Sequence, residues 1–334
     1  MTQFWLKIIA FITAFSAITS NGIAQRLVIE GRYTGEDGTI VYLKEYTDRN
    51  FVLVDSARTQ RGRFFFNREV YDVVAYGLTS SKTAKQPPLF FAGADTVHIK
   101  LDEYKGTMAV NGSPTDSLYR LLLPHVQDST FSVLALSQKL PASPLVPYFA
   151  MRYFGWQLSL ADLQTLKANL DTALNANRYY QQLERLVAAR EGLQVGQVAP
   201  NFQVRSAQGR LMRLTDFRGR PVVLNFWASW CGDCRREIPT LVTAHGLLAE
   251  RGVQFVGISL DTSAKDWLAC VARYKMAWTQ LSDLRGWDAS VVPSYALRWV
   301  PTTFILDAEG RILSVSYNDK ELKANLEKAF NVSL

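Results

Sequence analysis

Two cysteines separated by two residues are the part of this sequence best suited to chemistry. Cys231 and Cys234 lie in the stretch Phe226-Trp-Ala-Ser-Trp-Cys-Gly-Asp-Cys-Arg-Arg-Glu-Ile-Pro239. The apolar run 221–227 predicts a buried strand, and residues 231–249 predict a helix. At the start of a helix, unpaired N–H groups and the helix dipole lower a thiol pKa below its usual value of about 8.5. We therefore expect Cys231 to be the nucleophile and Cys234 to resolve a mixed disulfide.

Charged residues beside the pair bear on its reactivity. Arg235 and Arg236 add positive charge near the sulfurs, and Asp233 opposes it. Glu237 follows Cys234 by three residues, where a partly buried carboxylate with a raised pKa can hold or take the proton of the resolving thiol. On spacing alone, a solvated helix carboxylate is the alternative interpretation of Glu237.

Other uses of a close cysteine pair fit the sequence less well. A zinc site needs four ligands, yet there is no second C-x-x-C, and His245 is the only histidine after residue 192. A purely structural disulfide would close a very short loop and stabilise little. A one-cysteine peroxidase needs a hydroxyl residue near a single thiol, but the residue three before the first cysteine is Ala228. The third cysteine, Cys270, lies among apolar residues of a predicted helix and is expected to be buried and inert.

Length and composition indicate a globular protein with two folded units. The 334 residues exceed one ordinary core, and the apolar (48%) and charged (20%) fractions are ordinary. The net charge of +7 is spread along the chain without the basic block of a nucleic-acid-binding surface. No glycine-rich phosphate loop joins a predicted strand to a helix, so no nucleotide, flavin or metal cofactor is implied.

The first 24 residues have the three-part pattern of a secretory signal. One cation, Lys7, precedes an apolar run at 8–18, and small residues precede a cut after Ala24. The run is shorter than the roughly 20 residues that span a bilayer, which favours cleavage over an uncleaved anchor helix. We expect a periplasmic protein without stable membrane insertion, in a compartment where disulfides persist.

Three regions follow the signal. Residues 25–113 predict an antiparallel, β-sandwich-like all-β domain, because short strands recur between turns. These strands are predicted at residues 26–33, 39–46, 51–55, 63–67, 71–76 and 96–101. Residues 114–192 predict a helical connector with leucines spaced by three and four. Residues 193–334 predict an α/β domain with a mixed sheet. Its strands are predicted at 221–227, 253–258, 301–306 and 311–316, after a small hairpin at 202–214, and its helices at 231–249, 265–274 and 320–329.

The segments around the cysteine pair resemble the thioredoxin superfamily, and more closely the TlpA/ResA-like thiol-disulfide oxidoreductases of the bacterial cell envelope. The similar region covers about residues 195–330. It includes Val195-Gly-Gln-Val-Ala-Pro-Asn-Phe202, Leu214-Thr-Asp-Phe-Arg-Gly-Arg-Pro-Val-Val-Leu-Asn-Phe-Trp-Ala-Ser-Trp-Cys231, Val300-Pro-Thr-Thr-Phe-Ile-Leu-Asp307 and Gly310-Arg-Ile312. The resemblance implies a thioredoxin-like C-terminal domain with a redox-active disulfide between Cys231 and Cys234.

The resemblance also implies roles for residues outside the pair. Pro301 matches a cis proline that faces the active disulfide, and the backbone of Val300 would pair with an extended client segment. Trp230 would flank the same surface. Glu237 matches the proton-handling glutamate of ResA-like members. Asp233 stands where proline or histidine is common, so the family's redox potential does not carry over.

By this resemblance the protein reduces disulfides of client proteins and receives electrons from a membrane thiol carrier. Dedication to cytochrome c maturation would change only the substrate. The front half resembles a domain of unknown function that precedes thioredoxin-like domains in envelope proteins, through its strand pattern and the segment Asn111-Gly-Ser113. The alternative is a binding or adaptor protein in which the β domain does the main work and the cysteines form an inert bridge.

Overall fold

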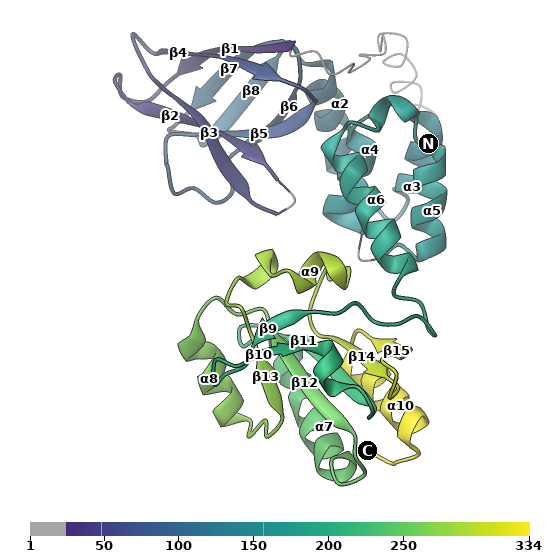
Figure 1. Cartoon of the computed structure of the whole chain (residues 1–334). Coiled ribbons are helices and arrows are strands. Elements are labelled where there is room, and N and C mark those ends of the chain that lie inside the picture. The colour runs from purple at the N-terminus through teal and green to yellow at the C-terminus, as the bar shows by residue number, and fades with distance from the viewer. Residues whose placement is uncertain (1–24, 48, 156) are drawn as a thin grey trace. The chain divides into compact units, whose positions relative to one another are not determined.

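The computed structural model describes residues 25–47, 49–155 and 157–334 (Figure 1). The predicted secretory signal, residues 1–24, lies outside these residues. The chain divides into two compact units, the first ending at Glu184 and the second spanning Arg185–Leu334. The finer division at residues 113 and 192 stays a prediction. Among the described residues, no helix is both long enough and apolar enough to span a membrane.

The first unit contains two four-stranded sheets. One has the order β4-β1-β7-β8 and the other β3-β2-β5-β6. Their strands are β1 (Gln25–Tyr33), β2 (Ile40–Tyr46), β3 (Phe51–Arg58), β4 (Arg63–Val70), β5 (Val74–Thr79), β6 (Leu89–Ala92), β7 (Thr96–Asp102) and β8 (Thr107–Asn111). Every neighbouring pair is antiparallel except β1 and β7, which are parallel. Buried and exposed residues alternate along β4 and β7, as expected for strands with one face in a core. The predicted antiparallel all-β domain is confirmed.

The bounds predicted for the strand at residues 71–76 are wrong. The strand β5 spans Val74–Thr79, so it begins and ends three residues later. The Asp72 carboxylate accepts hydrogen bonds from Asn177 Nδ2 at 2.6 Å and from the backbone N–H of Arg178 at 2.9 Å. Asp72 thus ties a turn to the start of a helix that lies a hundred residues later, which a local strand pattern does not reveal. The short strands β6 and β8 were also not predicted.

Helices follow the two sheets in the chain, and aromatic residues of α4 and α6 pack against the sheet that contains β5 and β6. They are α2 (Pro114–Leu122), α3 (Val133–Lys139), α4 (Leu145–Phe149), α5 (Leu160–Asn169) and the start of α6 (Arg178–Glu191). The Tyr148 ring lies 4.8 Å from the ring of Phe91, on β6, and 5.2 Å from the ring of Tyr179. The hydroxyl of Tyr179 accepts a hydrogen bond from the backbone N–H of Ala75, on β5. An aromatic core therefore joins these helices to the sheet.

The second unit is built on a five-stranded sheet with the order β13-β12-β11-β14-β15. The strands are β11 (Val222–Trp227), β12 (Gln254–Ser259), β13 (Thr279–Leu281), β14 (Thr302–Leu306) and β15 (Ile312–Ser316). The central strand β11 is parallel to β12 and antiparallel to β14, so the predicted mixed sheet is confirmed. The helices are α7 (Gly232–Leu248), α8 (Ala264–Arg273), α9 (Val291–Ser294) and α10 (Asp319–Phe330), and a small hairpin joins β9 (Gln203–Arg205) to β10 (Leu211–Arg213). The short elements β13 and α9 carry too few residues to show a periodic pattern.

Every residue of β11 is buried, which explains its uninterrupted apolar sequence. Because β14 runs antiparallel to β11, the end of one strand lies beside the start of the other, with Phe226 opposite Thr302. The loop that follows β11 and the loop that precedes β14 therefore meet at the same edge of the sheet. The first loop carries Cys231 and the second carries Pro301.

Candidate active site

The cysteine pair lies at the N-terminus of α7. Cys231 is the N-cap residue, and its Sγ accepts a hydrogen bond from the backbone N–H of Cys234 at 3.1 Å. The two cysteines are joined in a disulfide, with 5.3 Å between their Cα atoms. Cys231 is 7% exposed and Cys234 is 1% exposed. Cys231 is thus the more accessible sulfur and the one that receives an N–H donor, which stabilises a thiolate after reduction.

The loop before β14 faces this sulfur. The Val300–Pro301 peptide bond is cis, as the resemblance implies. The Sγ of Cys231 lies 3.3 Å from the carbonyl oxygen of Val300, although 69 positions separate the two residues in sequence. When Cys231 is reduced, its S–H can donate to this carbonyl, so the oxygen marks where a thiol proton can be held.

Glu237 is buried in the second unit, so the alternative of a solvated carboxylate is wrong. It is 1% exposed, and its Oε1 accepts hydrogen bonds from Asn225 Nδ2 at 3.1 Å and from Thr303 Oγ1 at 3.3 Å. Burial raises the pKa of the Glu237 carboxyl to about 8, because these two hydrogen bonds stabilise the charged form less than the loss of water destabilises it. The carboxyl is therefore mostly protonated at neutral pH.

The two donors to Glu237 come from paired strands. Asn225 on β11 lies opposite Thr303 on β14, and Asn225 Nδ2 also donates to Thr303 Oγ1 at 2.8 Å. Both donors point at one carboxyl oxygen, whereas Oε2 is buried without a hydrogen-bond partner. A proton on the carboxyl is thus directed to Oε2, since Oε1 already accepts two hydrogen bonds.

The predicted charge around the sulfurs is largely paired. Arg236 forms an ion pair with Asp233 on the surface of α7. The Nη1 of Arg235 donates to the backbone oxygen of Ser229 at 2.6 Å.

Trp230 is 53% exposed, and its ring lies 6.4 Å from the ring of Trp287. The surface around the disulfide therefore presents an aromatic side chain next to the sulfurs.

Asp261, which anchors the loop that carries the cysteines, was not predicted from the sequence. This buried carboxylate accepts hydrogen bonds from the backbone N–H of Ser229 at 2.9 Å, from Ser229 Oγ at 2.6 Å and from Ser259 Oγ at 2.6 Å. The backbone oxygen of Ser229 is held by Arg235, so the serine is fixed through both its main chain and its side chain. An acidic residue two positions after the buried strand β12 was the signal in the sequence.

Cys270 is buried and unpaired with another cysteine, and burial raises the pKa of its thiol. A buried thiol with a raised pKa is a poor nucleophile at neutral pH. This agrees with the inert role expected from its apolar neighbours.

The chain is similar to known proteins in both halves. Residues 195–315 match the AhpC/TSA family, and residues 27–119 match a domain of unknown function, DUF4369. The thiol-disulfide oxidoreductase ResA of Bacillus thuringiensis subsp. konkukian is 28% identical over 138 residues, which cover 41% of this chain and 78% of ResA. The thioredoxin-like protein YneN of Bacillus subtilis is 33% identical over 143 residues, which cover 41% of this chain and 81% of YneN.

A solved structure is similar over the same domain. The thioredoxin domain of a thiol-disulfide oxidoreductase from Bacteroides vulgatus has a TM-score of 0.39 and 28% identity, covering 41% of this chain and 98% of that domain. The AhpC/TSA match at residues 195–315 includes the disulfide, Pro301 and the strands β11 to β14 of the mixed sheet. The chain therefore belongs to the thioredoxin-like family of ResA-like thiol-disulfide oxidoreductases, through the domain that contains Cys231 and Cys234.

Proposed function

We propose that this protein reduces disulfides of client proteins in the periplasm, with Cys231 as nucleophile and Cys234 as resolving cysteine. One observation supports this assignment above the others. The Cys231 sulfur caps α7, where it accepts the N–H of Cys234, and it faces the carbonyl of Val300 beside the cis bond to Pro301. The helix N-terminus and the N–H of Cys234 stabilise the thiolate, and the carbonyl of Val300 marks a main-chain edge beside the sulfur where a peptide can dock.

The proposed cycle is a balanced thiol-disulfide exchange. The Cys231 thiolate attacks one sulfur of the client disulfide, the client S–S bond breaks, and the released client sulfur takes up a proton. Cys234 then loses its proton and attacks Cys231 Sγ, which breaks the mixed disulfide and releases the second client thiol. Two electrons pass from the enzyme dithiol to the client, and the Cys231–Cys234 disulfide remains.

Glu237 is proposed to handle the proton of Cys234. The two residues are three positions apart on α7, a spacing that places side chains on adjoining parts of one helix surface. A carboxyl whose pKa is about 8 is ionised in a minor fraction of the molecules at neutral pH, and this ionised form can accept the proton that Cys234 loses. The hydrogen bonds from Asn225 and Thr303 fix its orientation and leave Oε2 for the exchanging proton.

Val300, Pro301 and Trp230 are proposed to contact the client. An extended client segment would pair with main-chain groups of Val300, while Pro301, which has no N–H, keeps that edge open. The exposed ring of Trp230 would cover the client side chains next to its disulfide.

The remaining assignments concern cellular context. Residues 1–24 are proposed to direct secretion and to be removed. A membrane thiol carrier is proposed to reduce the enzyme disulfide after each cycle, since each turnover consumes two electrons. Cytochrome c maturation is one process with such clients, and the N-terminal domain is proposed to present or recognise a partner.

Reduction of insulin disulfides tests this function. The full-length protein, kept reduced by a thiol reductant, should accelerate insulin reduction, and Cys231→Ser should abolish the acceleration. Cys270→Ser is the matched control, since it removes a thiol of the same domain outside the pair, and it should retain the activity. Equal activity of wild type and Cys231→Ser would refute the proposal and favour a binding protein with an inert disulfide.

Clients can be identified by trapping. In Cys234→Ser the second attack cannot occur, so the mixed disulfide between Cys231 and the client should accumulate in a periplasmic extract. Mass spectrometry of the trapped species would name the clients and show whether they include apocytochromes.

A further inference from the structure

One row of residues crosses four strands of the sheet in the second unit, and its three side chains are polar. The row runs from Gln280 on β13 through Gly257 on β12 and Asn225 on β11 to Thr303 on β14. Residues paired in this way point to the same face of a sheet. The side chains of Gln280, Asn225 and Thr303 are buried. A polar layer therefore lies inside the core, on the face from which Glu237 contacts Asn225 and Thr303.

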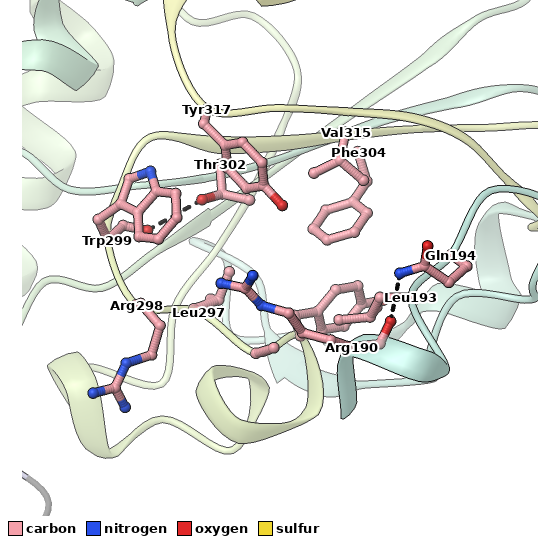
Figure 2. A pocket seen from close by; sticks show the side chains of 12 residues that line it. Arg190, Leu193, Gln194, Leu297, Arg298, Trp299, Thr302, Phe304, Val315 and Tyr317 are labelled. Atoms are coloured by element: carbon pink, nitrogen blue, oxygen red, sulfur yellow. Dashed lines mark hydrogen bonds between the residues drawn. The ribbon is translucent and has the colours of Figure 1, made fainter. Parts of the chain in front are cut away.

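The opposite face of β14 has contacts of its own. Thr302, the residue before Thr303, lines a pocket together with Phe304 (Figure 2). Its Oγ1 donates a hydrogen bond to the backbone oxygen of Trp299 at 3.1 Å (Figure 2). Successive residues of a strand point to opposite faces, so this pocket and the carboxyl of Glu237 lie on different sides of the sheet. A change in the polar row therefore does not act through the pocket.

The side chain of Gln280 reaches across β12 at Gly257. A Cβ at position 257 would lie 2.4 Å from Gln280 Oε1 and 3.1 Å from Gln280 Nε2. Contacts this short would force the amide to move, so only glycine lets it lie against the strand. Gly257 is the residue of β12 that is paired with Asn225. The Gln280 amide is thus placed beside Asn225, although one strand separates the two residues in the sheet.

Hydrogen bonds fix the direction of both amides. Trp227 Nε1 donates to Gln280 Oε1 at 3.2 Å, and because an indole can only donate, the other end of this amide is the donor Nε2. Asn225 Nδ2 donates to Glu237 Oε1 at 3.1 Å and to Thr303 Oγ1 at 2.8 Å. Since the two atoms of an amide diverge from the same carbon, Asn225 Oδ1 is turned away from β14. The strand on that side is β12, over which the Gln280 amide lies.

The two remaining ends of these amides are complementary. Asn225 Oδ1 is a buried acceptor and Gln280 Nε2 a buried donor, and within the part of the chain that the structure describes neither has a hydrogen-bond partner. Buried polar atoms are nearly always hydrogen-bonded. A donor and an acceptor that are too far apart for a direct bond are commonly joined by one buried water.

We propose that Gln280 is a positioning residue for Glu237: through one bridging water, its Nε2 holds Asn225 Oδ1 and keeps Asn225 Nδ2 directed at the Glu237 carboxyl. This inference rests on the proposed function, in which Glu237 accepts the proton of Cys234. It extends the proton site from α7 across β11 and β12 to β13, and the donor-only indole of Trp227 fixes the direction of the chain at its far end.

The orientation of Asn225 decides which form of the carboxyl is favoured. With Nδ2 toward Glu237, the ionised carboxylate receives an N–H donor. With the amide reversed, Oδ1 would face the carboxyl, and only the protonated form could make a hydrogen bond to it. Release of Asn225 should therefore raise the pKa of Glu237. The negative charge of Asp319, at the start of α10, also raises this pKa, and a change at Gln280 leaves that charge in place.

An NMR titration of the oxidised, full-length protein tests this proposal. In protein labelled with ¹³C-carboxyl glutamate, the signal that is absent from Glu237→Gln belongs to Glu237. Gln280→Met, which keeps the volume and removes the amide, should raise the midpoint of this signal by about one pH unit or more, as expected when a charged group loses a hydrogen bond. Gly257→Ala keeps the amide but displaces it, and it should raise the midpoint in the same direction.

The matched control is Gln254→Met. Gln254 lies on β12 three residues before Gly257, so its side chain is on the other face, where Nε2 donates to the backbone oxygen of Phe217 at 2.7 Å. This variant should leave the midpoint unchanged. Wild-type midpoints in both Gln280→Met and Gly257→Ala, or an equal rise in Gln254→Met, would overturn the positioning role. Denaturation midpoints check that each variant is folded.

Two further measurements complete the test. A crystal structure of the oxidised protein should show a water bonded to Asn225 Oδ1 and Gln280 Nε2, and a structure with neither this water nor a direct bond would overturn the link. In the reduced protein, release of a mixed disulfide at pH 7 should be about tenfold slower in Gln280→Met than in wild type, because the ionised fraction of Glu237 falls tenfold with each unit of its pKa. The difference should vanish at alkaline pH.

The outcomes distinguish this inference from the function on which it rests. The NMR titration needs no client, so it reads the link between Gln280 and Glu237 whatever the protein reduces. An unchanged titration with normal insulin reduction would overturn the positioning role alone. A shifted titration with an unchanged rate of mixed-disulfide release would overturn the proton-handling role of Glu237. Equal insulin reduction by wild type and Cys231→Ser would overturn the proposed function itself.

Discussion

Replacing Glu237 with glutamine removes a buried titratable group without a change in shape, and the effect on stability should depend on pH. Burial raises the pKa of the Glu237 carboxyl from its ordinary 4.5 to about 8 in the folded protein. Between these pH values the folded state binds the proton more tightly than the unfolded state does. The wild type therefore loses stability as pH rises from 4.5 toward 8, whereas Glu237→Gln, which has no proton to lose, does not.

The size of the effect follows from the difference in proton affinity. Each tenfold difference is worth about 1.4 kcal/mol, so between pH 5 and pH 8 the wild type should lose up to about 4 kcal/mol of unfolding free energy relative to Glu237→Gln. A constant offset between the two proteins carries no information, because the amide and the carboxyl differ in hydrogen bonding at every pH. The test is the slope of the difference against pH.

Urea unfolding of the oxidised full-length protein measures this slope. Six of the eight tryptophans lie in the second unit, the exceptions being Trp5 and Trp156, so tryptophan fluorescence reports mainly on the unit that contains Glu237. Oxidation removes the titration of the cysteine pair. The matched control is Glu250→Gln, an exposed carboxylate in the same unit, whose curve should run parallel to that of the wild type. A parallel curve for Glu237→Gln would refute the inference that this carboxyl is protonated at neutral pH.

Three further changes test the site and its support. In the reduced protein, iodoacetamide should modify Cys231 faster than Cys270, because a helix N-terminus favours the first thiolate and burial disfavours the second; equal rates in peptide mapping would contradict this. Asp261→Asn should lower the unfolding free energy by about 1 to 3 kcal/mol, since the hydrogen bonds from Ser229 lose a charged acceptor, and wild-type stability would argue against its anchoring role. Phe226→Ala should cost about 3 to 5 kcal/mol in urea unfolding, because this ring is fully buried in β11, and a cost below about 1 kcal/mol would show that the core there can collapse.

Local pattern was sufficient for the elements next to the sulfurs. The run at 221–227 predicted β11, and the start of α7 was predicted within one residue of its observed position at Gly232. The strand β11 is an uninterrupted apolar run, and α7 is 17 residues long, so each gives a clear local signal. A helix that begins at a cysteine places that sulfur beside its N-terminal N–H groups, and this holds in any fold. The short elements β6, β8, β13 and α9 were missed because three to five residues show no period.

The sequence by itself determined that Cys231 caps a helix with Cys234 one turn away, because hydrogen bonds and side chain spacing within one turn depend only on neighbouring residues. The resemblance already implied that Val300 and Pro301 face the disulfide. Only the tertiary structure decided that Glu237 is buried between Asn225 and Thr303, since β14 joins β11 from far along the chain. Desolvation depends on every segment that packs around a group. The raised pKa of Glu237, on which the proposed proton transfer depends, therefore follows from the tertiary packing around its carboxyl. The three-residue spacing from Cys234 does not determine it.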